Sequence, residues 1–283
     1  MIIRIIALSG VLIIILIVAI TYTLKKAQKL PLNSPVNFLE DRAQDNNQKT
    51  VVCVGNSITH GQVSYNYVNI LSERLSDNGY QFVNAGINGN LAYNVVKRLG
   101  KIIECDPDYV TLLIGTNDAN ASLSEKNSAR YMRDMALPDK PNAEFFRKNV
   151  KELISQLKKR TNAKIAILSL PPIGEDINHI AYQRTKEYSG IIQAVAKKNN
   201  VDYLPLHEKI TEYIQAEGQH PRLSYDNGFR GIMIKGIFSH LLLGTSFDKI
   251  ASNNGFLILT DFLHLNSRGA KMTADLIENW ILK

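Results

Sequence analysis

The chain has 283 residues, of which 45 % are hydrophobic and 21 % are charged, so disordered and collagen-like proteins are excluded. The 33 Lys and Arg residues exceed the 26 Asp and Glu residues, which gives a formal net charge of +7. The basic residues are spread along the chain without a long basic run or interleaved aromatic residues. This pattern argues against a nucleic-acid partner.

The N-terminus carries a long uncharged segment, Ile5–Leu24. A helix of about 20 residues is about 30 Å long, which matches the hydrocarbon core of a bilayer. No A-x-A cleavage site is present, so we predict a single-pass membrane anchor over residues 1–29, with a signal segment as the alternative. Three lysines after the segment favour a cytoplasmic domain. Arg4, before the segment, and the usual role of apolar N-terminal segments in export favour an extracytoplasmic domain. We expect the extracytoplasmic orientation.

The chain beyond this segment divides into a polar stretch and a folded domain. Residues 30–49 are rich in Pro, Asn, Asp and Gln and have no apolar period, which predicts a linker. Residues 50–283 alternate short β-rich runs with helical patterns. Residues 206–255 interrupt this alternation, so we expect an insertion there, ahead of a terminal helix over Ser267–Leu282.

Strands and helices alternate along the domain. In Glu144–Lys159, for example, the apolar residues follow the i, i+3, i+4 spacing of an amphipathic helix. Strands separated by helices imply right-handed crossovers, so we predict an α/β protein with a mostly parallel five-stranded sheet between two helical layers. The predicted strands are Thr50–Val54, Gln81–Asn84, Tyr109–Ile114, Lys164–Ser169 and Val201–Leu204.

Three of the predicted strands end in short polar loops, namely 55–61 (GNSITHG), 84–90 (NAGINGN) and 115–118 (GTND). The carboxyl ends of neighbouring parallel strands lie at one edge of a sheet, so these loops are expected to converge. They offer a serine hydroxyl, glycine N–H groups and an asparagine amide. Such a set is typical of a nucleophile beside an oxyanion hole.

A base for this nucleophile is predicted near the C-terminus. Asp261 and His264 are three residues apart, so one turn can bring the carboxylate against the imidazole. With Ser57 they form a triad in the order Ser, Asp, His, without the G-x-S-x-G elbow of the α/β-hydrolases. His60 is the rival base because it lies three residues from Ser57. It has no acidic neighbour, so we interpret it as a loop or substrate-binding residue.

The four segments VGNSITHG, NAGINGN, GTND and DFLHLN resemble the four sequence blocks of the SGNH or GDSL-type hydrolases. The blocks occur in the family's order over residues 50–283. One block alone is weak evidence, whereas four at predicted strand ends are specific. The resemblance implies an esterase or lipase with a flavodoxin-like, three-layer α/β/α fold.

The resemblance also implies a role for each matching residue. Ser57 matches the nucleophile, His264 the base and Asp261 the carboxylate that orients the base. The backbone N–H groups of Ser57 and Gly89 and the side-chain amide of Asn117 match the oxyanion hole. No cofactor or metal is implied, and no metal-ligand or nucleotide-binding motif stands out in the sequence.

One residue departs from the family pattern, because Asn56 stands where the family has aspartate. Asparagine keeps the shape and the acceptor oxygen of aspartate, so we expect activity to survive with an altered stability of the loop. We predict hydrolysis of carboxylic esters through an acyl-enzyme. Two alternatives remain open. The same residues could transfer an acyl group to an envelope polysaccharide, or the domain could be an inactive binding module tethered to a membrane.

The substrate class is open among lipid, lysophospholipid and acylated-sugar esters, with the membrane as the expected partner of the N-terminal segment. The apolar stretch within the expected insertion either lines an acyl pocket or forms an ordinary amphipathic helix packed on the core. The residues predicted to bind substrate are His60, Ile237, Phe238 and Leu241.

Overall fold

The computed structural model describes residues 2–40, 47–218, 222–226 and 228–283. Its centre is a sheet of five parallel strands in the order β2-β1-β3-β4-β5, which is the flavodoxin-like order. The predicted α/β class and the parallel sheet are therefore confirmed. The strands are β1 (Lys49–Gly55), β2 (Tyr80–Gly86), β3 (Tyr109–Leu113), β4 (Lys164–Leu168) and β5 (Asp202–Leu204).

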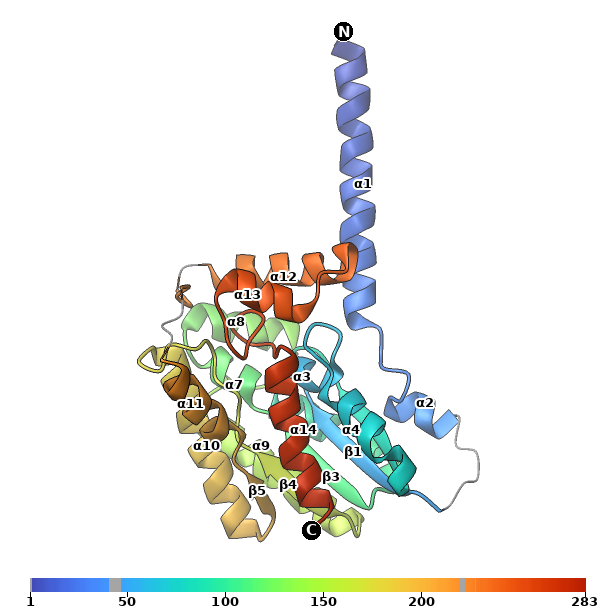
Figure 1. Ribbon diagram of the computed structural model, residues 1–283, viewed down its shortest axis with the longest axis vertical. Coiled ribbons are helices and arrows are strands. Elements are labelled where there is room, and N and C mark those ends of the chain that lie inside the picture. The colour runs from blue at the N-terminus through green and yellow to red at the C-terminus, as the bar shows by residue number, and fades with distance from the viewer. Residues whose placement is uncertain (1, 41–46, 219–221, 227) are drawn as a thin grey trace.

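Helices precede, connect and follow the strands (Figure 1). The first half of the chain contains α1 (Ile2–Gln28), α2 (Pro35–Glu40), α3 (Ser57–His60), α4 (Tyr67–Leu75), the 3₁₀ turn η1 (Ser76–Asn78), α5 (Ala92–Lys97), α6 (Leu99–Glu104), α7 (Thr116–Ala121) and α8 (Glu125–Asp134). The second half contains α9 (Ala143–Arg160), α10 (Ile180–Asn199), α11 (Leu206–Glu217), α12 (Phe229–Leu243), α13 (Phe247–Asn254) and α14 (Ser267–Ile281).

The helices form two layers around the sheet. Helix α14 packs on α4 and α11 on one face, while α9 packs against α5 and α10 on the other. Strands β1 and β3 are buried along nearly their whole lengths, because both faces of the sheet are covered. This burial explains why their sequences are continuous apolar runs rather than alternating ones.

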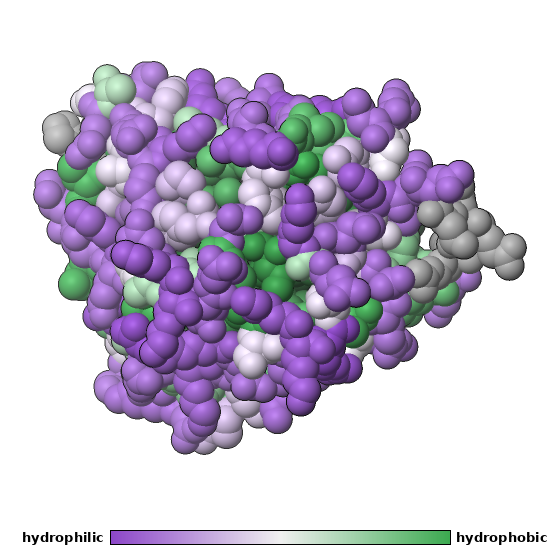
Figure 2. Space-filling view, turned by 90° about the horizontal axis from the view of Figure 1, so that it is seen from below, coloured by the Kyte–Doolittle hydropathy of each residue, from purple (hydrophilic) through white to green (hydrophobic). Residues whose placement is uncertain are grey.

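The two ends of the domain differ. Figure 1 shows α12 and α13 lying across the end where α3 follows β1, which is the end of the carboxyl termini of the strands. Figure 2 views the opposite end, where hydrophilic side chains surround a small hydrophobic area. The polar loops predicted to carry the chemistry lie at the first of these ends.

The N-terminal segment differs from its prediction. It forms the long helix α1, but no helix in the described part of the chain is long and apolar enough to cross a membrane. The predicted membrane-spanning helix over Ile5–Leu24, and with it the membrane as a partner, is therefore not supported. The last turns of α1 are polar and pack on the domain, where Thr23 and Ala27 are buried. Helix α2, within the predicted linker, also contacts the domain, at α6 and β2.

Candidate active site

Ser57 lies at the sharp turn from β1 into α3. A Cβ on Gly55 would lie 2.0 Å from Thr59 Oγ1 and 2.6 Å from the Leu113 carbonyl oxygen, so only glycine fits where the strand ends. The Asn56 side chain accepts the Ile58 N–H at 3.0 Å and caps the short helix. Ser57 is the first residue of α3, and the first N–H groups of a helix have no acceptor inside it.

The base lies in the loop between α13 and α14. An isolated bridge between Leu259 and Leu265 closes this loop. Within it, one oxygen of the Asp261 carboxylate accepts the backbone N–H groups of Leu263 and His264, at 2.7 and 2.9 Å. These bonds form a local turn that orients the second carboxylate oxygen toward the His264 ring.

The structure brings the three predicted triad residues together. His264 Nε2 lies 3.0 Å from Ser57 Oγ, and His264 Nδ1 lies 2.8 Å from Asp261 Oδ2. Burial acts to raise the pKa of Asp261, but its bonds with His264 and the two backbone N–H groups outweigh burial and hold that pKa below its usual value. Asp261 is therefore a carboxylate that can orient the ring and stabilise its protonated form.

The predicted oxyanion donors Gly89 and Asn117 line the same cavity as Ser57. Gly89 has φ +76°, a backbone conformation that favours glycine, and a Cβ there would lie 2.7 Å from the flexible end of the Met135 side chain. Asn117 is buried at the start of α7. Its amide nitrogen donates to the Asn90 carbonyl at 3.0 Å, and its oxygen accepts from the Tyr131 hydroxyl at 2.9 Å. These two bonds fix which end of the amide is the donor.

Two charged residues that the sequence reasoning missed hold the loops, the half-buried Arg98 and the buried Glu175. The Arg98 guanidinium donates to the carbonyl groups of Gly55 and Ala85, at 3.0 and 2.8 Å, and to the Asn90 side chain at 2.8 Å. Burial lowers the pKa of Arg98 to about 10. Arg98 therefore links the ends of β1 and β2, and no short motif marks it in the sequence.

Glu175 has the same kind of role on the other side of the site. Its carboxylate accepts the backbone N–H groups of Leu257, Ile258 and Leu259, each at 2.8 Å. Burial raises the pKa of Glu175, and these three bonds act in the opposite direction. The carboxylate fixes the segment that leads to Asp261. A lone glutamate in a Pro- and Gly-containing loop gives no signal of this contact.

Asp118 completes the GTND loop. Its buried carboxylate accepts the Ala92 N–H at 3.1 Å, which joins α7 to the first turn of α5. Burial raises the pKa of Asp118 to about 7, although the backbone N–H groups act in the opposite direction. This carboxylate is structural, because it does not line the cavity beside Ser57.

A cavity of about 220 Å³ opens beside the triad, lined by Ser57, Gly89, Asn117 and His264 together with apolar side chains. Of the four predicted substrate-binding residues, only Ile237 lines it. Phe238 and Leu241 lie on the same helix, α12, but outside the lining. His60 is also outside it and is buried, and burial lowers the pKa of its ring to about 4. The apolar lining residues include Val63, Met135, Phe229, Met233, Ile237 and Leu263.

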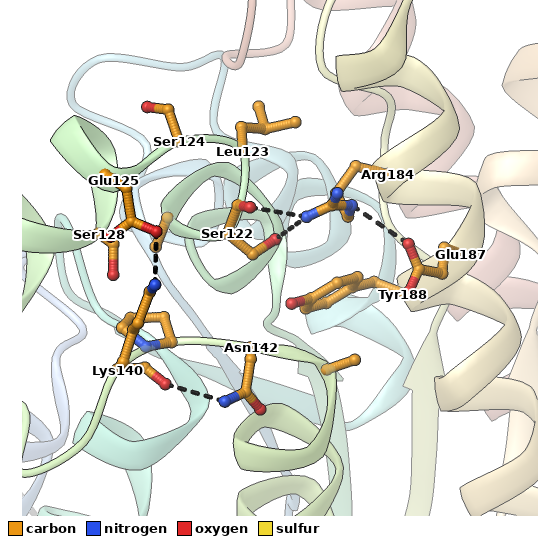
Figure 3. Close-up of a pocket in the computed structure, with 13 residues that line it drawn as sticks. Ser122, Leu123, Ser124, Glu125, Ser128, Lys140, Asn142, Arg184, Glu187 and Tyr188 are labelled. Carbon is orange, nitrogen blue, oxygen red and sulfur yellow. Dashed lines mark hydrogen bonds and ion pairs between the residues drawn. The ribbon is translucent and has the colours of Figure 1, made fainter.

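A second, larger cavity of about 510 Å³ lies between α8, the N-terminus of α9 and α10 (Figure 3). The charged groups around it bind one another. Lys140 pairs with Glu125, while Arg184 pairs with Glu187 and donates to Ser122. No serine in it contacts a histidine, so this cavity lacks the parts of a nucleophilic site. In the described residues no cluster of His, Cys, Asp or Glu could hold a metal ion.

A serine bonded to a histidine, a histidine bonded to a carboxylate, and donors around the serine define a site for acyl transfer on a parallel α/β sheet. Serine hydrolases use an arrangement of this kind. The chain belongs to the GDSL-like lipase/acylhydrolase family, whose model matches residues 53–272, and it is accordingly a carboxylic ester hydrolase. The match confirms the resemblance seen in the four sequence blocks.

Solved structures of similar fold include an acetyl xylan esterase, AlAXEase (24 % identity, TM-score 0.60, covering 82 % of this chain and 99 % of that one). An acetylxylan esterase from Geobacillus stearothermophilus gives 16 % identity and a TM-score of 0.57, with coverage of 82 % and 94 %. A lipase/acylhydrolase from Enterococcus faecalis gives 18 % and 0.55, with coverage of 83 % and 95 %. At these identities the likeness concerns the fold. No curated protein sequence matched the chain.

Proposed function

We propose that the protein hydrolyses esters of short acyl groups, such as acetyl groups on a sugar, through an acyl-enzyme on Ser57. The observation that carries this proposal is the continuous chain of hydrogen bonds from Ser57 through His264 to Asp261, beside a small cavity. His264 takes the Ser57 proton as Oγ attacks the ester carbonyl, and then delivers that proton to the leaving alcohol. Water, activated by the same ring, releases the acid.

The oxyanion of each tetrahedral intermediate would be held by the backbone N–H groups of Ser57 and Gly89 and by the Asn117 amide. Each donor of this kind is worth about 3 kcal/mol in the transition state. Asp261 holds the Nδ1 proton of His264, so that Nε2 faces Ser57 as the acceptor. These are the roles that the family resemblance implies for the same residues.

The size of the cavity supports a short acyl group rather than the long chain of a lysophospholipid. Its volume of about 220 Å³ lies below the roughly 300–1,000 Å³ of sites that hold drug-sized ligands. Two of the solved structures of similar fold are acetyl xylan esterases, which agrees with a small acyl group on a sugar. An apolar lining suits the acyl methyl groups.

The proposal is tested with a fluorophosphonate probe and with p-nitrophenyl esters from acetate to octanoate. Wild type should be labelled by the probe, and its kcat/KM should be higher for esters in the range from acetate to butyrate than for longer esters. Ser57→Ala should lose both labelling and turnover, whereas Ser122→Ala, a matched change in the second cavity, should keep both. Labelling that survives in Ser57→Ala, or a preference for octanoate, would contradict the proposal. Addition of a sugar acceptor distinguishes hydrolysis from acyl transfer.

A further inference from the structure

The C-terminal end of α1 forms one wall of the catalytic cavity. Leu24, Ala27 and Gln28 line the cavity together with Ser57 and His264, although they lie far from both in the sequence. Figure 1 shows α1 meeting the domain at the end of α12, over the carboxyl ends of the strands. The site is therefore bounded by a helix that lies outside the residues matched by the family model.

Specific contacts hold the end of α1 in this place. The Lys26 ammonium donates to the Leu241 carbonyl on α12 at 3.0 Å. Ala27 packs in a small buried cluster with Val63 and Leu241. After the helix, the Asn33 carbonyl accepts the Asn84 N–H on β2 at 2.9 Å. The chain is thus fixed on both sides of the segment that faces the cavity.

One contact reaches the oxyanion loop itself. The Asn88 amide donates to the Ala27 carbonyl at 2.7 Å, and Asn88 directly precedes Gly89. The Ala27 carbonyl is among the last four of α1, which no N–H of the helix can reach, so it needs an outside donor. The other end of the Asn88 amide, Oδ1, is buried without a hydrogen-bond partner. The bond to Ala27 therefore fixes this side chain.

We infer that the end of α1 is a functional part of the active site, with two roles that rest on the proposed ester hydrolysis. Leu24 limits the length of the acyl group that the cavity accepts. The Ala27 carbonyl acts through Asn88, a positioning residue, to hold the Gly89 N–H where the oxyanion forms. Acyl specificity is thus set partly by a segment that the catalytic sequence blocks do not contain.

The first role is tested with Leu24→Ala in the full chain, on the p-nitrophenyl ester series. Shortening Leu24 should make room for about two methylene groups, which raises the hexanoate-to-acetate ratio of kcat/KM about tenfold. Leu16→Ala is the matched control. Leu16 lies on the same helix and is 58 % exposed against 56 % for Leu24, but it does not line the cavity. An unchanged ratio in Leu24→Ala, or an equal change in Leu16→Ala, overturns this role.

The second role is tested with Asn88→Ala. Loss of one hydrogen bond to the loop should lower kcat roughly fivefold for every ester, at an unchanged KM. A wild-type kcat, or an effect on KM alone, overturns the positioning role. If wild type is neither labelled by the probe nor active on any ester, the proposed ester hydrolysis itself is wrong. If wild type is labelled but the variants behave like wild type, only the inference about α1 is wrong.

Discussion

We expect Tyr131→Phe to lower kcat by loosening the Asn117 amide. The Tyr131 hydroxyl is buried, donates to Asn117 Oδ1 at 2.9 Å and accepts from the Asn120 amide at 3.2 Å. Phenylalanine keeps the ring and its packing but removes both bonds. The terminal torsion of an asparagine side chain is soft, so hydrogen bonds decide where its N–H points. Asn117 would then keep only its bond to the Asn90 carbonyl.

The size of the effect on kcat follows from the lost bond to Asn117, since the lost bond to Asn120 does not involve the oxyanion donor. A typical intramolecular hydrogen bond contributes about 0.5–1.5 kcal/mol net, which corresponds to roughly 2- to 12-fold in rate. The bond to Asn90 still opposes rotation of the amide, so we expect kcat to fall about 3- to 10-fold. Removal of the donor itself, in Asn117→Ala, should cost about 100- to 1,000-fold. KM should change little in either variant.

A double-mutant cycle measured by steady-state kinetics tests this reasoning. If Tyr131 acts through the Asn117 amide, Tyr131→Phe should cost nothing further in kcat when Asn117 is already alanine. Tyr225→Phe is the control, because its hydroxyl donates to Asn120 and does not touch Asn117. The reasoning is refuted if the Tyr131→Phe effect persists in full in the Asn117→Ala background, or if Tyr225→Phe has the same effect on kcat.

Three further substitutions test the residues that support the site. Folding raises the pKa of Asp118 from 3.8 to about 7, so the contribution of Asp118 to stability is present below pH 4 and is lost as the pH rises toward 7. The melting temperature of Asp118→Asn should therefore depend less on pH between pH 4 and 8 than that of wild type. Parallel curves of melting temperature against pH for the two proteins would contradict this. Glu175→Gln should lower both melting temperature and kcat, because one amide oxygen cannot replace two carboxylate oxygens bound to three N–H groups. Asn56→Asp should leave kcat within about threefold, since either side chain can accept the Ile58 N–H and cap α3; a tenfold gain would show that Asn56 limits activity.

The sheet could be predicted from the sequence because its central strands, β1 and β3, are buried on both faces. Strand β1 begins one residue before the predicted Thr50–Val54 and ends one residue after it, and the terminal helix α14 differs from its prediction by one residue at its end. The loops that follow the strands were predictable for a related reason. Parallel strands place their carboxyl ends at one edge, so loops far apart in the sequence meet there.

The packing of the N-terminal segment could not be predicted in the same way. An apolar run shows that a helix needs a nonpolar environment. The spacing of apolar residues along the helix does not specify which surface of the domain the helix contacts. The contacts of α1 are long-range, such as Lys26 with Leu241, and neither partner belongs to a motif. The roles assigned to His60, Phe238 and Leu241 rested on sequence proximity or on the apolar character of a helix. The structure places all three outside the cavity lining.

The residues that hold the site are buried or half-buried polar groups from outside the four blocks. Tyr131, Arg98 and Glu175 each bind backbone or amide groups near the reacting atoms, where an unsatisfied partner would cost about 1–3 kcal/mol. Their identity depends on which N–H or carbonyl is left unpaired in the fold, so a sequence pattern cannot reveal them. We therefore expect the activity of this chain to depend on more than the four blocks. Asparagine rather than aspartate at position 56 should leave kcat nearly unchanged, whereas the loss of Glu175 should lower it.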